Sequence, residues 1–216
     1  MAGVFGWIAQ SGVVQGVIIG ATLAFLTAIL VMNLVRRRIT TTVNGWDSIR
    51  VCGRPDNGIL VRAACAKALP AVNLFEEAAY WTTTVDATGR RLSRRSQYVM
   101  RFPPGQLPPN RAFWSLTVTD VVGYMVKTPA GRSSVHDGSG LTARADGVIE
   151  IRIQRTPPER DPQNWLPAPP GAFKLTLRAY LPGPAVLDDT YRVPPVVRVG
   201  GVGTRAGTAS AEAGGR

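Results

Sequence analysis

The hydrophobic pattern begins with one long apolar segment. No Asp, Glu, Lys, Arg or His occurs in residues 1–35, and residues 13–35 are the most apolar part. As a helix, this part would be about 35 Å long, enough to cross a hydrocarbon core of about 30 Å. Arg36, Arg37 and Arg38 then end the segment. A cleaved signal peptide would start with a positively charged region and have a shorter apolar core. We therefore predict a retained transmembrane anchor over residues 1–38.

A stripe of small residues follows one face of this predicted helix. Its members recur at spacings of four and are Gly12, Gly16, Gly20, Ala24 and Ala28. Small side chains let a second helix approach closely in lipid, although Gly and Ala are common in membrane helices generally. We expect a helix-packing face whose partner is a second copy of the chain or another membrane protein.

Beyond the anchor, the pattern predicts one short helix and then strands. Residues 39–55 form a polar connector, and residues 59–68 form an alanine-rich helix that Asp56, Asn57 and Gly58 would cap. Aromatic and β-branched residues predict the strands, which we place at 78–86, 97–102, 112–120, 123–128, 148–154 and 173–180. We expect 112–120 and 123–128 to form a hairpin. The tail, residues 200–216, has no apolar period and is predicted to be disordered.

Alternation within these strands predicts how they pack. In 173–180 the apolar residues occupy one face, and Lys174, Thr176 and Arg178 occupy the other. Half-buried strands that are separated by turns in this way are typical of a β-sandwich. The predicted fold is mainly β: a jelly-roll-like antiparallel β-sandwich with one short helix over residues 56–199, preceded by one transmembrane helix.

Composition removes several chemistries. The chain has 216 residues, 23 Gly, 17 Pro, two Cys and one His. So few ligands exclude a multi-Cys/His zinc site and an iron–sulfur cluster, and we expect neither a metal nor a cofactor. The net charge is +11, with 22 Arg and 3 Lys. Arg90, Arg91, Arg94 and Arg95 cluster at a turn; this is a solvated face or a contact for anionic lipid. We expect no nucleic acid, because no recognised binding motif accompanies the charge.

Several strings resemble a known bacterial family. They are EEAAYW at 76–81, RFPPGQLPP at 101–109, AFWSLT at 112–117, GY at 123–124, NWLPAP at 164–169 and FKLTLRAYLP at 173–182. Over residues 46–199 the chain resembles the family called domain of unknown function 1214. The resemblance implies a β-rich, jelly-roll-like domain in exported or envelope proteins. It supplies no catalytic residue, and residues 125–138 differ from the string expected there.

Two sets of residues suggest chemistry. His136 lies beside Ser133, Ser134 and Asp137, but a catalytic triad forms by spatial proximity rather than sequence adjacency, so we interpret it as a solvated loop histidine. The aromatic residues near the family strings are either core or part of a ligand cleft. The candidate cleft residues are Arg101, Trp114, Tyr124, Asn164, Trp165 and Arg178, with Asn164 and Trp165 foremost.

The side of the membrane is left open. Arginines that follow the helix place the domain in the cytoplasm by the positive-inside rule, whereas the family resemblance implies export; we lean to the cytoplasm. Cys52 and Cys65 would form a disulfide only in an oxidising compartment.

Two functions remain. The first is a membrane-anchored, non-catalytic β-domain that binds a partner protein, lipid or glycan at the cell envelope. The alternative is an envelope hydrolase or carbohydrate-active enzyme, although no acid–base pair of carboxylates can be singled out.

Overall fold

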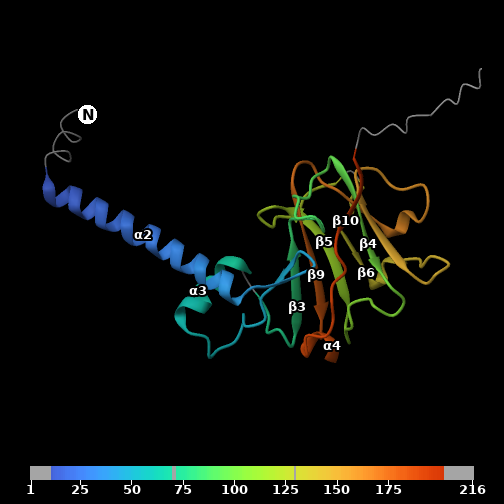
Figure 1. Cartoon of the computed structure of the whole chain (residues 1–216), viewed down its shortest axis with the longest axis horizontal. Coiled ribbons are helices and arrows are strands. Elements are labelled where there is room, and N and C mark those ends of the chain that lie inside the picture. The colour runs from blue at the N-terminus through green and yellow to red at the C-terminus, as the bar shows by residue number, and fades with distance from the viewer. Residues whose placement is uncertain (1–10, 70–71, 129, 202–216) are drawn as a thin grey trace, which may run out of the picture. The chain divides into compact units, whose positions relative to one another are not determined.

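The computed structural model describes residues 11–69, 72–128 and 130–201, which form two compact units. The first unit contains the chain up to Thr41 together with Ile49–Phe75, and the second contains Thr42–Ser48 and the chain from Glu76 onward. Figure 1 labels the elements along the chain. Of the tail predicted to be disordered at 200–216, residues 200 and 201 belong instead to strand β10 (Val197–Gly201). Residues 202–216 of the tail and residues 1–10 of the predicted anchor fall outside the described residues.

The first unit is helical. Helix α2 (Gly12–Ile39) is capped by Ser11, whose hydroxyl accepts a hydrogen bond from the backbone N–H of Val14. Its most apolar 18-residue window has a mean hydropathy of 2.3, and no residue of the helix is buried within the structure. It is therefore long and apolar enough to span a membrane, a property that signal sequences near an N-terminus share.

Helix α3 (Ile59–Ala68) matches the helix predicted at 59–68. Its N-cap is Gly58 without a side-chain cap; the neighbouring Asn57 amide instead donates to the carbonyl of Val51 at 2.6 Å. Cys65 of α3 forms a disulfide with Cys52, and their Cα atoms are 5.5 Å apart. The disulfide ties α3 to the segment that precedes it.

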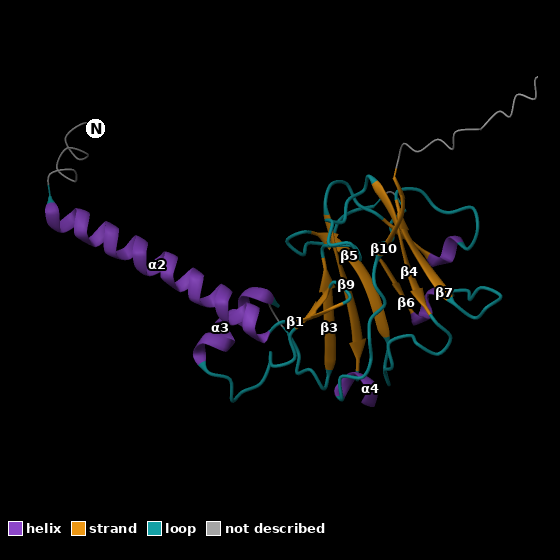
Figure 2. Cartoon of the chain, in the orientation of Figure 1, coloured by secondary structure: helices purple, strands orange, loops and turns teal. Residues whose placement is uncertain are grey.

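The second unit is a sandwich of two sheets, in which strands dominate (Figure 2). The six-stranded sheet has the order β1-β2-β3-β9-β5-β6, and the four-stranded sheet has the order β10-β4-β7-β8. The strands of the first are β1 (Thr41–Val43), β2 (Trp46–Ser48), β3 (Ala78–Thr83), β9 (Phe173–Tyr180), β5 (Trp114–Asp120) and β6 (Ser134–His136). Those of the second are β10 (Val197–Gly201), β4 (Ser96–Phe102), β7 (Ile149–Gln154) and β8 (Trp165–Pro167). The predicted mainly β fold is confirmed.

Short helical turns complete this unit: α4 (Pro184–Leu187) and the 3-10 turns Asp137–Ser139 and Pro162–Asn164. Long apolar side chains from both sheets fill the space between them. The ring centroids of Tyr98 on β4 and Phe173 on β9 are 5.9 Å apart, and those of Phe102 and Trp114 are 6.0 Å apart. The core is therefore built from facing residues of the two sheets.

The connector predicted at 39–55 contains a β-hairpin. β1 and β2 are joined at Asn44 and Gly45, and both residues have positive φ (54° and 80°). Asn-Gly is the pair that a tight two-residue hairpin favours. The hairpin is held in place by Trp46, which is buried and donates from its indole N–H to the carbonyl of Pro194 at 2.9 Å.

The hairpin predicted from 112–120 and 123–128 is wrong. Residues 123–128 make only an isolated bridge, Thr119 to Met125, and the neighbour of β5 on that side is β6. The carboxylate of Asp120 accepts hydrogen bonds from the backbone N–H groups of Val122, Gly123 and Tyr124. Those from Gly123 and Tyr124 lower the pKa of Asp120 most. This local loop replaces the ladder that a hairpin would need.

Candidate functional site

Polar side chains gather on the outer face of the four-stranded sheet. Inward and outward side chains alternate along β4 and β7, and the register of the two strands brings their outward residues side by side. Met100 pairs with Ile151 and points into the core, where both are fully buried, whereas Arg101 pairs with Glu150 on the opposite face. The outward residues of β7 are Glu150, Arg152 and Gln154. Side chains that can donate or accept hydrogen bonds are thereby gathered on one side of the sheet.

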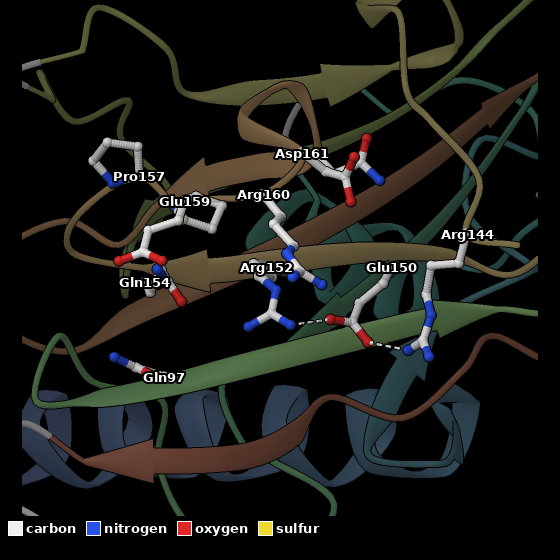
Figure 3. A pocket seen from close by; sticks show the side chains of 11 residues that line it. Gln97, Arg144, Glu150, Arg152, Gln154, Pro157, Glu159, Arg160 and Asp161 are labelled. Atoms are coloured by element: carbon white, nitrogen blue, oxygen red, sulfur yellow. Dashed lines mark hydrogen bonds and ion pairs between the residues drawn. The ribbon is translucent and has the colours of Figure 1, made fainter.

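Glu150 lies at the centre of this face, with only 6% of its side chain exposed. Its Oε2 accepts from Arg101 Nε at 2.9 Å and from Arg144 Nη1 at 3.2 Å, and its Oε1 lies 2.6 Å from Arg152 Nη2. Figure 3 shows Glu150 between Arg152 and Arg144. Charge-assisted hydrogen bonds of this kind fix the geometry of both partners. One carboxylate thus holds three guanidinium groups, each of which is about half exposed.

A cleft of about 640 Å³ opens over this network. Its lining comes from β4, β7 and the segments on either side of β7: Gln97, Arg144, Glu150, Arg152, Gln154, Pro157, Pro158, Glu159, Arg160, Asp161 and Asn164. Most of these side chains are charged or carry an amide (Figure 3). The cleft therefore suits a ligand with many hydrogen-bonding groups better than an apolar one.

One wall of the cleft is held by side-chain hydrogen bonds to a neighbouring loop. Asn164 is buried; its amide donates to the carbonyl of Thr142 at 2.7 Å and its Oδ1 accepts from the N–H of Thr142 at 2.9 Å. The hydroxyl of Thr142 donates to Asp161 at 2.9 Å. These bonds fix the segment 161–164 relative to the loop and so shape the cleft.

Three of the predicted cleft residues lie on this side of the sandwich. Arg101 holds Glu150, and Asn164 lines the cleft. Trp165 on β8 is in register with Arg152 of β7, and its indole N–H donates to the carbonyl of Gln154 at 2.9 Å. Of the two residues placed foremost, Asn164 lines the cleft and Trp165 lies outside its lining.

The other three lie elsewhere. Trp114 is 2% exposed in the core. Arg178 is on the outer face of the six-stranded sheet, where it donates to the hydroxyl of Thr117 at 3.0 Å. Tyr124 is 71% exposed in the loop after β5. The structure does not bring these three side chains to the cleft.

Sequence reasoning missed the centre of the cleft. Ile149, Ile151 and Ile153 occupy the inward face of the predicted strand 148–154. The available signal was the alternation itself, which places Glu150, Arg152 and Gln154 together on the other face. The burial of Glu150 among arginines from three segments had no local signal.

His136 has a local structural role. Its side-chain Nδ1 accepts a hydrogen bond from the backbone N–H of Gly138 at 3.0 Å, and the backbone N–H of His136 donates to the hydroxyl of Ser139 at 2.9 Å. This is a reciprocal cap of the turn Asp137–Ser139. In the described ranges no group of three or more His, Cys, Asp or Glu side chains is placed to hold a metal ion.

Comparison with known proteins gives a family but no described activity. The model of the family "Protein of unknown function (DUF1214)" matches residues 77–184, half of the chain, from β3 through β9 and including the cleft. No curated protein matches this chain.

Two solved structures are similar. The VPA0106 protein of Vibrio parahaemolyticus is 27% identical, with a TM-score of 0.56, and the alignment covers 67% of this chain and 36% of that one. An uncharacterized protein from Burkholderia cenocepacia is 13% identical, with a TM-score of 0.39, over 85% of this chain and 51% of that one. This chain thus spans only about a third to a half of their lengths. On the family match, together with the strings quoted above, the chain belongs to the DUF1214 family of proteins of unknown function.

Proposed function

We propose that this protein is a membrane-anchored, non-catalytic binding module of the cell envelope, and that its ligand is a glycan held in the Glu150 cleft. The observation that carries the proposal is the lining of that cleft, in which guanidinium, amide and carboxylate groups converge. A glycan presents many hydroxyl groups that both donate and accept hydrogen bonds. Such a lining can satisfy them without an apolar contact surface.

The state of Glu150 favours binding over catalysis. Both of its carboxylate oxygens already interact with guanidinium groups. The carboxylate therefore serves to position the arginines. A glycosidase needs two carboxylates that flank the scissile bond and exchange protons with it. Glu159 and Asp161 also line the cleft, and Asp161 accepts from the hydroxyl of Thr142. The hydrolase alternative rests on these two residues.

The proposed location is the outer side of the membrane. Helix α2 supplies the anchor, and the Cys52–Cys65 disulfide supports an oxidising compartment. The arginines at 36–38 are the opposing signal. Protease treatment of intact spheroplasts that carry a tag after Arg216 tests this. We expect the tag to be removed; a protected tag would place the domain in the cytoplasm.

Binding is tested with the full chain in detergent micelles. Calorimetry with maltohexaose, tetra-N-acetylchitotetraose and oligogalacturonate should give saturable heat for at least one of them. Arg160→Ala should weaken that binding by about tenfold, because a charge-assisted hydrogen bond is lost. Arg111→Ala, at an exposed arginine outside the cleft lining, is the matched control.

Three outcomes count against the proposal. They are no saturable binding to any of the three oligosaccharides, equal weakening by both variants, and release of reducing sugar from a bound oligosaccharide. The last outcome would favour the hydrolase alternative, and Glu159→Gln and Asp161→Asn would then be expected to abolish turnover.

A further inference from the structure

A second cleft lies at the end of the sandwich where β4 and β9 begin and β7 ends. Its volume is about 640 Å³, and it is lined by Ser93, Arg94, Arg95, Arg155, Pro170, Gly171 and Ala172. Three of these seven residues are arginines and none is acidic. This distinguishes it from the Glu150 cleft, where acidic and basic residues alternate.

The backbone holds the two arginine segments together. β4 and β7 are antiparallel with Tyr98 opposite Ile153, so the turn before β4 and Arg155 after β7 lie at the same end of the ladder. The N–H of Arg94 donates to the carbonyl of Gly171 at 3.1 Å. A bridge between Ser93 and Ala172 adds a second link. The position of the three arginines is thus set by the sheet.

Among the described residues, the arginines of this cleft are not paired with carboxylates. The Nε of Arg94 is buried and has no hydrogen-bond partner. Among the residues that the structure describes, no ion pair joins Arg94, Arg95 or Arg155 to a carboxylate. Other arginines of the same sheet are paired: Arg152 with Glu150, and Arg198 with Asp86. Three neighbouring cations repel one another, and a buried donor without an acceptor is unfavourable. An anion in the cleft would relieve the repulsion among the three arginines.

We propose that this cleft binds a phosphate group carried on a larger polar molecule. A phosphate monoester has a charge of about −1.5 to −2 at neutral pH and three acceptor oxygens, which balances most of the cluster, whereas a single carboxylate balances one arginine. Guanidinium groups bind phosphate oxygens through paired N–H donors. The cleft is much larger than the phosphate alone, so the rest of the ligand occupies the surface formed by residues 170–172.

The first test uses inorganic phosphate and the full chain in detergent micelles. Calorimetry should show saturable binding that weakens by tenfold or more in the double variant Arg94→Gln, Arg155→Gln. Arg111→Gln is the matched control and should bind as the unmodified chain does. If the double variant does not fold, Arg155→Gln alone serves, because Arg155 is exposed. The absence of saturable phosphate binding, or equal affinity in the variant and the unmodified chain, would overturn the proposal.

The second test distinguishes a soluble phosphomonoester from a lipid headgroup. The chain is placed in nanodiscs of phosphatidylcholine alone, or of phosphatidylcholine with 30 mol% phosphatidic acid, a lipid with a phosphomonoester headgroup, and titrated again with inorganic phosphate. A lower apparent phosphate affinity only in the phosphatidic acid discs, and only with the arginines intact, assigns the site to a lipid headgroup. Equal affinity in both discs assigns it to a soluble ligand. Failure of either test leaves the glycan proposal intact, because Arg94 and Arg155 do not line the Glu150 cleft.

Discussion

Glu150 of β7 and Arg101 of β4 are paired across the antiparallel ladder, and the Nε of Arg101 donates to Oε2 of Glu150 at 2.9 Å. Strand register alone makes this contact, since residues directly opposite each other share a face. The same carboxylate also holds Arg144 and Arg152. It thus connects two neighbouring strands and the loop before β7.

We expect Glu150→Gln to destabilise the β unit by about 2 kcal/mol, because three guanidinium groups lose the carboxylate that balances them. Chemical unfolding of the full chain in micelles measures the change. Glu159→Gln, at an exposed glutamate of the same cleft, should stay within about 0.5 kcal/mol of the unmodified chain. Equal effects of the two substitutions would contradict a central role for Glu150.

The lowered pKa of Asp86 predicts how the free energy of unfolding depends on pH. Its side chain is buried, which by itself raises its pKa, but hydrogen bonds from Thr88, Arg198 and the backbone of Arg90 outweigh burial and lower the pKa below the ordinary value. A lowered pKa in the folded state means that the stabilisation is fully present above the unfolded-state pKa of about 4 and is lost as the pH falls through the folded pKa.

Unfolding free energies measured between pH 7 and pH 3 should therefore fall less steeply below pH 4 in Asp86→Asn than in the unmodified chain. At pH 7 this variant should also be less stable, by about 1–3 kcal/mol. Asp56→Asn, at an exposed aspartate, should follow the unmodified curve. Parallel curves for all three proteins would show that Asp86 does not account for the acid sensitivity.

The two tryptophans predicted for the cleft should respond differently to substitution. Trp114 is buried between the sheets, so Trp114→Ala should cost about 3–5 kcal/mol of unfolding free energy. Trp165→Phe removes one indole hydrogen bond to Gln154 and should cost about 1 kcal/mol. Thermal melts with near-ultraviolet circular dichroism measure both. A larger loss for Trp165→Phe would mean that Trp165, not Trp114, is the core residue.

The Cys52–Cys65 disulfide closes a loop with a sequence separation of 13 residues. In the chain-entropy model, a loop of this size stabilises the folded state by about 3 kcal/mol. We expect Cys52→Ser, Cys65→Ser to expose 49–75 to limited proteolysis, while the β unit keeps its melting temperature. Reductant should have the same effect on the unmodified chain and none on the variant. A lower melting temperature of the β unit would contradict this independence.

We propose that the stripe of Gly12, Gly16, Gly20, Ala24 and Ala28 packs against another helix in the membrane. A Cβ atom built at Gly16 or Gly20 has no atom within 4 Å, so larger residues fit the isolated chain and act only on a partner. If the chain is crosslinked in membranes, the crosslinked product with the partner helix should be lost in the double variant Gly16→Leu, Gly20→Leu. Ile18→Phe adds bulk to the opposite face and should leave that product unchanged; loss in both variants would rule out a role specific to the stripe.

Local sequence signals determined most of the elements. The charge-free stretch before Arg36 corresponds to α2, the alanine-rich run to α3, and clean alternation to β9. These signals succeed because a helix or strand that buries one side repeats with a fixed period. The predicted pairing of 112–120 with 123–128 is wrong because the carboxylate of Asp120 accepts hydrogen bonds from the backbone N–H groups of Val122 and Gly123.

The tertiary structure alone decided which residues meet. Arg101 and Glu150 are 49 positions apart, and the sequence contains no mark of the register that pairs them. Likewise, Arg178 and Trp114 were grouped with Arg101 although their strands lie in the other sheet. A periodic pattern reports which face a side chain occupies within its own strand, while the neighbour across the ladder depends on the order and register of strands distant in the chain.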